Sequence, residues 1–239
     1  MVPESLLREF GQHRLRRHVA LAPFTSFKVG GPADWMLEVS STDELTSAVR
    51  LATQERMPVT VLGGGSNVLI GDFGIRGLVV VVRTNRIAMS GANEVRADAG
   101  VTMNGLVRWT ITRGLGGLAA WAGTPGTVGG ALCGNAHFDG RAIGQLVTAG
   151  ALLARDGTIA VVAAGKLEFG YDCSRLQRSG EILLWSAGAL IDRAGLKGVA
   201  RGGARVSEIH ANFIVNEGGA TAREIRELGR GGGGDPRCD

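Results

Sequence analysis

The chain has 239 residues, 44% of them hydrophobic, and a formal net charge of +4 from 26 Lys and Arg against 22 Asp and Glu. This composition excludes a disordered chain and provides enough apolar side chains for a substantial core. An aromatic content of 5% and scattered basic residues exclude a nucleic-acid-binding face, which needs concentrated positive charge and stacking aromatics. The first residues lack an apolar signal segment, and no run approaches the roughly 20 apolar residues of a membrane span. We therefore expect a cytoplasmic protein with no membrane partner.

Glycine and cysteine set two further limits. Glycine supplies 39 of the 239 residues, well above the roughly 7% of average proteins, and most of these glycines stand beside Val, Leu, Ile and Ala. That setting favours tight turns and close approach of the backbone to a ligand. The three cysteines are far apart and form no CxxC pair, so the sequence predicts neither a disulfide framework nor a metal site and indicates a reducing compartment.

The first half of the chain alternates helical and strand-like segments. Mixed apolar and charged residues over 4–17 predict a short amphipathic helix, and alternation over 35–39 predicts a strand. Ser41 then precedes charged residues and a helical apolar pattern, which is how a capped helix begins. Further strands are expected at 59–62, 77–83 and 95–100, and a further helix at 104–113.

The second half begins with residues 114–139, which contain eight glycines and no charge before Asp139. Because a solvated linker would expose the apolar residues of this stretch, we expect loops and a short helix packed against an apolar surface. Residues 146–162 predict a hairpin that turns at Asp156-Gly157. Residues 181–195 predict a strand that runs directly into a helix, and the tail 229–239 has no core-forming residue, so we expect it to be disordered.

A glycine-rich turn follows the strand predicted at 59–62. Its residues are Gly63, Gly64, Gly65, Ser66 and Asn67. Successive backbone N–H groups without side chains can converge on a phosphate oxygen, and the Ser and Asn side chains add donors. A tight structural turn explains the same residues equally well. The turn matches neither the P-loop nor the GxGxxG motif.

A second loop, GTPGTVGGALCGNA at 123–136, favours ligand binding over a structural turn. It combines a Pro-Gly turn, a Gly-Gly pair, two threonine hydroxyls and a terminal Asn135 in otherwise apolar sequence. Apolar walls with a few fixed hydrogen-bond donors suit a flat heteroaromatic ring with polar edges.

Five blocks in the same order give the chain a resemblance to a known family. They are TSFKVGGPAD at 25–34, VLGGGSNVLIGDFGIRGLVV at 61–80, AGTPGTVGGALCGNA at 122–136, FGYDCSRLQ at 169–177, and AGLKG with GGARVSEIHANFIVN over 194–216. These blocks resemble the UDP-N-acetylenolpyruvoylglucosamine reductases of the MurB type. The resemblance implies a FAD-dependent, NADPH-using reductase of UDP-N-acetylglucosamine enolpyruvate, which acts in peptidoglycan precursor synthesis.

The resemblance also implies the architecture and the roles of individual residues. It predicts an α+β protein in which a FAD-binding domain of the vanillyl-alcohol-oxidase (PCMH) type, at 20–187, follows a helical extension at 1–19 and precedes a shortened α/β substrate domain at 188–228. The FAD-binding domain would divide into parts at about 20–87 and 88–187. By position, the residues implied at the FAD site are Gly63, Gly64, Gly65, Ser66, Asn67, Leu69, Gly123, Thr124, Pro125, Gly126, Thr127, Val128, Gly129, Gly130, Asn135 and Ala136. Tyr171, Ser174 and Lys197 are implied at the nucleotide-sugar site, with Tyr171 and Asp172 at catalytic positions.

The chain departs from the family at three catalytic places. Asp172 stands where the family has an arginine that favours developing negative charge. A block that carries the proton-donating serine is absent beside Ser186, and the C-terminal tail has no counterpart of the family's catalytic glutamate. Arg175 is three residues from Asp172, but in an extended segment it would point to the opposite face.

These departures leave three functions open. The chain is an active reductase, or a degenerate member that binds FAD without turnover, or a protein that keeps only nucleotide-sugar binding. His137, beside the second glycine loop, is a further candidate, although a lone histidine more often belongs to the scaffold.

Overall fold

The computed structural model describes residues 3–91, 93–138, 140–189, 198–206 and 214–230. The first sheet has the order β1-β2-β4-β3. It contains β1 (Arg16–Ala20), β2 (Pro32–Val39), β3 (Val59–Leu62) and β4 (Ile75–Val82). β2 and β3 run parallel to β4, and α2 (Thr42–Gln54) makes the crossover that parallel strands require. The expected strand, capped helix and strand are therefore confirmed.

The start of α2 shows how local sequence sets an element. Ser41 is the N-cap, and its side chain accepts a hydrogen bond of 3.1 Å from the backbone N–H of Glu44. The Glu44 carboxylate accepts hydrogen bonds from Arg14 at 2.6 Å and from the backbone N–H of Ser40 at 2.8 Å. Chiefly through the bond from Arg14, these contacts lower the pKa of Glu44 to about 2.

Replacement of Glu44 by glutamine is expected to lower the free energy of unfolding at neutral pH by about 0.5–1 kcal/mol, as for other partly exposed ion pairs. The folded-state pKa lies below the ordinary value of 4.5. The contribution is therefore complete above about pH 4.5 and is lost as the pH falls toward about 2. Urea unfolding at neutral and at low pH measures this. The difference should vanish at low pH, and the same change at exposed Glu9 should have no effect at either pH.

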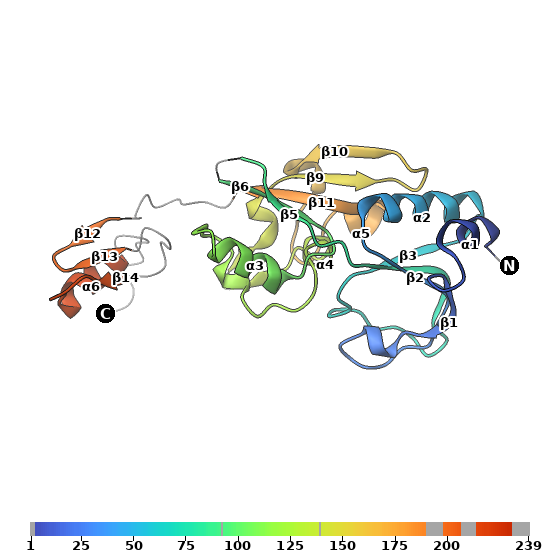
Figure 1. Cartoon of the computed structure of the whole chain (residues 1–239), viewed down its shortest axis with the longest axis horizontal. Helices are drawn as coiled ribbons and strands as arrows, with labels where there is room; N and C mark the ends of the chain where they lie inside the picture. Colours follow the sequence, from blue (N-terminus) through green and yellow to red (C-terminus); the bar gives the residue numbers. More distant parts are fainter. Residues whose placement is uncertain (1–2, 92, 139, 190–197, 207–213, 231–239) are drawn as a thin grey trace.

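The second sheet is fully antiparallel, with the order β10-β9-β11-β6-β5. Its strands are β5 (Ile87–Met89), β6 (Glu94–Asp98), β9 (Val147–Leu153), β10 (Ile159–Ala163) and β11 (Ile182–Ala189). The predicted hairpin is confirmed as β9 and β10. In Figure 1 these strands lie side by side on one side of α3 (Met103–Ile111) and α4 (Val128–Cys133).

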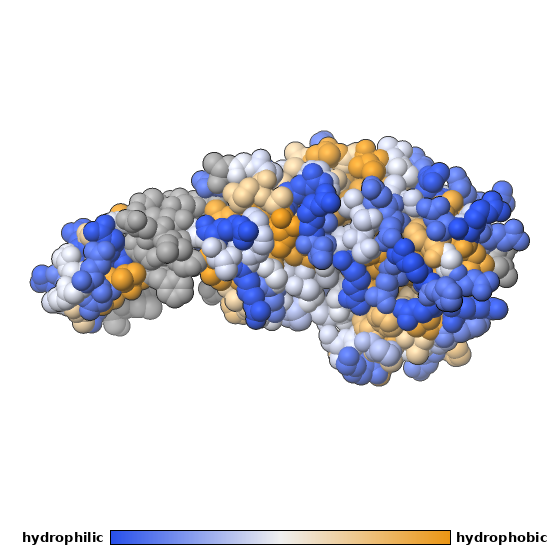
Figure 2. All heavy atoms as spheres, viewed as in Figure 1, coloured by the Kyte–Doolittle hydropathy of each residue, from blue (hydrophilic) through white to orange (hydrophobic). Residues whose placement is uncertain are grey.

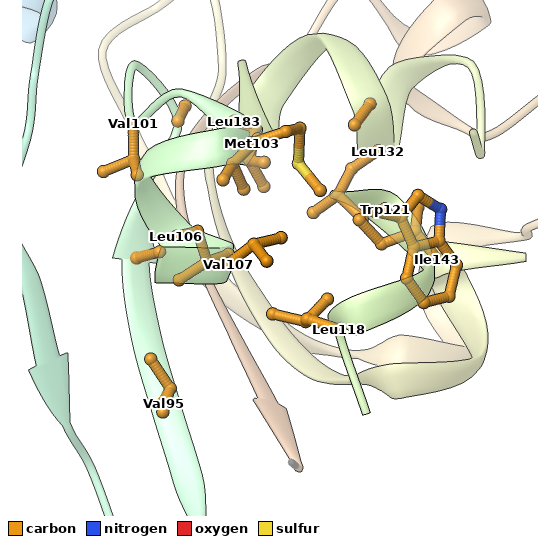
Figure 3. Packing of buried hydrophobic residues seen from close by; sticks show 14 of the residues in the cluster. Val95, Val101, Met103, Leu106, Val107, Leu118, Trp121, Leu132, Ile143 and Leu183 are labelled. Carbon is orange, nitrogen blue, oxygen red and sulfur yellow. The ribbon is translucent and has the colours of Figure 1, made fainter. Parts of the chain in front are cut away.

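Successive side chains of β9 pack into two different apolar clusters, one on each face of the second sheet. Leu152 belongs to the apolar cluster formed with α3 and α4, whereas Ala151 and Leu153 belong to the cluster formed with α2 and the first sheet. Figure 3 shows the first cluster, in which Trp121 and Leu132 lie among side chains from α3 and β11. Apolar residues of the glycine-rich stretch thus pack on the sheet, as expected, and the stretch includes η2 (Ala119–Trp121). Residues 150–153 of β9 are buried on both faces of the sheet.

The N-terminal residues belong to the same body. α1 (Glu4–Phe10) contributes buried Leu6 and Phe10 to the cluster formed with α2, and the boundary expected at residue 19 falls inside β1. The helix of the expected extension therefore packs against α2, and the division of the chain into domains stays a prediction. η1 (Ala22–Phe24) follows β1 and leads toward the glycine loops.

β11 contains Ser186, beside which the resemblance implies that the block with the proton-donating serine is absent. The strand continues through Ser186 to Ala189, and residues 185–189 pair with β6. Its pairing with β9 has two register shifts, between Leu183 and Trp185 and between Ala187 and Gly188. Ala187, Gly188 and Ala189, which follow Ser186, therefore complete β11 within the second sheet. The helix expected to follow lies in residues 190–197, outside the described residues.

The remaining elements are short, and the described C-terminal residues form a small unit of their own. β7 (His137–Phe138) pairs with β8 (Arg141–Ala142), and η3 (Ile143–Leu146), η4 (Ala164–Leu167) and α5 (Leu176–Ser179) connect the strands. The C-terminal unit has the sheet β12 (Ala200–Arg201), β13 (Ala204–Val206) and β14 (Ile214–Asn216), with α6 (Ala222–Arg230). Thr221 and Glu224 cap α6 reciprocally. Glu224 is thus a capping residue.

The surface carries apolar residues at one sheet edge. Ile159 and Val161 on edge strand β10 are exposed, and Figure 2 shows hydrophobic surface gathered over this strand. No helix among the described residues is long and apolar enough to cross a membrane.

Candidate functional site

The two predicted glycine motifs meet in space, although about sixty residues separate them in the chain. A Cβ on Gly64 would lie 2.7 Å from the Gly126 Cα, and one on Gly63 would lie 2.4 Å from the Thr127 Oγ1. Ser66 donates to the Pro125 carbonyl at 3.5 Å. The loops pack backbone against backbone, which only glycine permits at this spacing. Together they form one surface, which we call the glycine cradle and define as residues 63–67 and 123–127.

Backbone donors on the glycine cradle are available to a ligand. In the part of the chain that the structure describes, no protein acceptor binds the N–H groups of Gly64, Gly65, Ser66 or Asn67, nor those of Gly126 and Thr127. Unpaired N–H groups next to one another form an anion site, because their partial charges add. The cradle therefore carries unpaired donors of the kind that a diphosphate group requires.

Neighbouring residues fix the shape of the cradle. Gly65 has φ +65°, and a Cβ there would lie 1.8 Å from the Phe24 carbonyl oxygen. Ser26 donates its N–H to the Gly65 carbonyl at 2.9 Å. On the other loop, the Asn104 side chain accepts a 2.7 Å hydrogen bond from the Gly123 N–H. No local sequence pattern predicts the roles of Asn104 and Phe24, because both residues contact parts of the chain that are distant in sequence.

The helical part of the second loop supports the cradle from behind. Thr127 is the N-cap of α4, and its side chain accepts from the Gly130 N–H at 3.4 Å. Val128 is buried, and a Cβ on Gly129 would lie 3.0 Å from the Ala99 side chain. Leu69, also predicted at the FAD site, is 77% exposed. Val128 and Gly129 therefore contact the protein interior, and Leu69 lies on the surface.

Asn135 connects three segments instead of presenting its amide outward. It is 5% exposed with φ +45°, donates to the Gly170 carbonyl at 2.7 Å, and accepts from the Gly144 N–H at 3.0 Å. Ala136, next in the chain, donates its backbone N–H to the Ala131 carbonyl at 2.7 Å. Both residues fix the end of α4, and Asn135 also places the loop that carries Tyr171. The Asn135 amide is thus bonded within the chain, and the assignment of Asn135 and Ala136 to the FAD site stays a prediction.

The loop after Gly170 brings predicted catalytic residues to the surface beside β7. Tyr171 is 82% exposed, and its ring centroid lies 4.8 Å from that of His137. The Asp172 Oδ1 lies 3.2 Å from the His137 Nδ1, and Asp172 adopts φ +52°. We call these three residues the His137 cluster. The sequence flagged each residue separately, but their contact depends on the fold.

Other predicted residues are placed differently. Arg175 makes two hydrogen bonds of 2.8 Å to the Glu181 carboxylate, so its guanidinium does not take the place of the family's arginine beside Asp172. Ser174 is fully buried and donates to the Cys133 carbonyl at 2.8 Å, and its assignment to the nucleotide-sugar site stays a prediction. Burial also raises the pKa of the Cys133 thiol. Lys197 lies outside the described residues.

Comparison with known proteins decides the family. Residues 33–163 match a FAD binding domain, and residues 169–231 match the C-terminal domain of UDP-N-acetylenolpyruvoylglucosamine reductase. UDP-N-acetylenolpyruvoylglucosamine reductase 2 of Symbiobacterium thermophilum is 35% identical, with 94% of this chain and 87% of that protein covered. This chain belongs to the UDP-N-acetylenolpyruvoylglucosamine reductase family. The reductase of Synechococcus sp. is 38% identical over 90% of this chain and 86% of its own length.

Solved structures agree with the family and the predicted fold. The reductase (MurB) of Thermus caldophilus is 29% identical and superposes with a TM-score of 0.63, covering 91% of this chain and 93% of that one. The Bermuda grass isoallergen BG60 superposes over 80% of this chain with a TM-score of 0.55 at 14% identity, which shows the fold alone. The predicted α+β architecture with a FAD-binding fold is confirmed.

The match to the family also shows a gap in this chain. The stretch matched to the Symbiobacterium reductase is 271 positions long, and that matched to the Synechococcus reductase is 267, whereas this chain has 239 residues. Part of each reductase therefore has no counterpart here. This agrees with our expectation that a block found in the family is absent from this chain beside Ser186.

Proposed function

We propose that this chain binds FAD on the glycine cradle and, with NADPH as reductant, reduces UDP-N-acetylglucosamine enolpyruvate to UDP-N-acetylmuramate in the cytoplasmic synthesis of peptidoglycan precursors. The observation that carries the proposal is the set of unpaired N–H groups on both glycine loops. They fit the FAD diphosphate, and they lie within the residues that match a FAD binding domain. The relatives' shared name supplies the substrate.

The residues of the chain would bind and orient the reactants. The N–H groups of the cradle would hold the diphosphate, the Thr124 hydroxyl would lie along the cofactor, and exposed Tyr171 would contact the nucleotide sugar, while the Thr127 hydroxyl caps α4. The chemistry that FAD supplies when bound is hydride transfer, while the protein provides orientation and electrostatics. The negative charge of Asp172 opposes the charge that develops on a reduced enolpyruvyl group, so we expect slow turnover.

The purified protein is expected to be yellow and to release FAD on denaturation. A colourless preparation that does not take up added FAD would contradict the cofactor assignment. NADPH oxidation that depends on UDP-N-acetylglucosamine enolpyruvate tests the reaction separately. Spectrophotometric assays with and without the nucleotide sugar measure it.

A second candidate function is flavin binding without turnover. Asp172 and the missing block favour it, because the residues that hold the cofactor are present while two catalytic groups of the family are not. In that case the protein is yellow, yet NADPH oxidation does not respond to the nucleotide sugar. The two assays together separate the candidates.

A further inference from the structure

The His137 cluster is built from two segments that a buried residue joins. His137 lies on β7, two residues after Asn135, and Tyr171 and Asp172 follow directly after Gly170. Because Asn135 bonds the Gly170 carbonyl at 2.7 Å, the two segments are fixed to each other. The Gln177 side chain donates to the Asp172 carbonyl at 3.1 Å and holds the left-handed backbone there. The cluster is therefore preorganised by contacts within the chain.

The imidazole has one occupied and one available edge. Its Nδ1 faces the Asp172 carboxylate at 3.2 Å, and its ring lies against the Tyr171 ring. Its side chain is 40% exposed, and among the described residues none makes a hydrogen bond to Nε2. An imidazole that carries a proton on both ring nitrogens donates from both. The Nε2 edge can therefore donate to a ligand while Nδ1 donates to the Asp172 carboxylate.

Of the three side chains in the His137 cluster, only the imidazole can carry a positive charge. Asp172 and the Tyr171 phenol face it directly, and Cys173 follows them in the chain. The paired strand β8 carries Arg141, whose backbone partner is Phe138 and not His137. Arg175 is committed to Glu181.

We propose that His137, positioned by Asp172, donates from Nε2 to an oxyanion of the nucleotide sugar, beside the exposed ring of Tyr171. The inference rests on the proposed function and deepens it, because it names the chain's own cationic group at the substrate site.

Isothermal titration calorimetry on the full chain tests this, with UDP, UDP-N-acetylglucosamine and UDP-N-acetylmuramate as probes. We expect H137Q to weaken binding by about 10-fold, the usual effect of a hydrogen bond from a charged donor. If H137Q lowers the affinity for all three probes, His137 contacts the diphosphate. If it lowers the affinity for UDP-N-acetylmuramate alone, His137 contacts the carboxylate of that probe. The matched control H13Q, at an exposed N-terminal histidine, should leave every value unchanged.

A double-mutant cycle tests the positioning role of Asp172. H137Q should cost less in a D172N background than in the wild type, because the imidazole is no longer held. Wild-type affinity in H137Q would overturn the inference, while bound flavin in the same protein would leave the cofactor proposal standing. If the wild-type protein binds none of the probes, the proposed substrate and this inference both fail. The flavin content decides the cofactor independently.

Discussion

Replacement of Gly65 by alanine is expected to abolish flavin retention and to destabilise the folded protein. The new methyl group would lie 1.8 Å from the Phe24 carbonyl oxygen, and the backbone at this position has φ +65°. The left-handed conformation costs a non-glycine residue about 1–2 kcal/mol, and overpacking adds about 1–3 kcal/mol. The turn must therefore move.

Movement of the turn acts directly on the ligand site. Because Ser26 bonds the Gly65 carbonyl and the preceding Gly64 packs on Gly126, a shift at Gly65 displaces the N–H groups of both loops. Each hydrogen bond to a charged group contributes about 1.5–3 kcal/mol, so loss of one or two lowers the FAD affinity by about 100-fold or more. The ratio of flavin to protein after gel filtration and the midpoint of thermal unfolding measure the two effects.

Gly71 provides the matched control. It lies six residues further along the same connection, and a Cβ there would meet nothing within 4 Å. G71A should therefore keep the wild-type flavin content and melting temperature. A G65A protein with full flavin content and an unchanged melting temperature would show that the turn does not set the cofactor site.

The sequence predicted the loops of the cofactor site but not their contact. Three adjacent glycines after a buried strand indicate exposed backbone donors whatever the rest of the fold is, so 63–67 could be found locally. The packing of Gly64 on Gly126, by contrast, depends on how the two sheets come together around β9. No pattern within either loop encodes that geometry.

Asn135 and Ser174 show why the use of a polar residue is difficult to predict from the sequence. An amide or a hydroxyl offers the same donors and acceptors to a ligand as to the chain, so a polar residue at the end of a glycine loop suits both uses. The structure gives Asn135 two backbone partners and Ser174 one. Burial decides between the uses, and burial depends on tertiary packing.

The second sheet shows a similar limit at β11. Alternation of Leu183 and Leu184 between the two apolar clusters is visible in the sequence as a strand. The extension of the strand to Ala189 is not visible in the sequence, because Ala187, Gly188 and Ala189 have weak intrinsic preference for a strand. Pairing with β6 makes them part of the sheet.

Substitution of Asn135 is expected to have the second large effect, on stability and on nucleotide-sugar binding together. N135A removes the bonds to the Gly170 carbonyl and the Gly144 N–H and places a non-glycine residue at φ +45° without the side chain that Asn uses there. A backbone group left unsatisfied costs about 1–3 kcal/mol. We expect a loss of about 2–4 kcal/mol, which lowers the melting temperature by several degrees.

A graded series at Asn135 separates backbone strain from lost hydrogen bonds. N135G tolerates the positive φ and loses only the amide, so it should be less destabilised than N135A by about 1 kcal/mol. N135D keeps an acceptor for the Gly144 N–H but sets a carboxylate against the Gly170 carbonyl, so the loop that carries Tyr171 and Asp172 should loosen. All three variants should bind nucleotide sugar more weakly while retaining FAD, because the N–H groups of the cradle do not depend on this amide. Loss of flavin before loss of nucleotide-sugar affinity in N135G would instead place Asn135 at the flavin, as the sequence alone suggested.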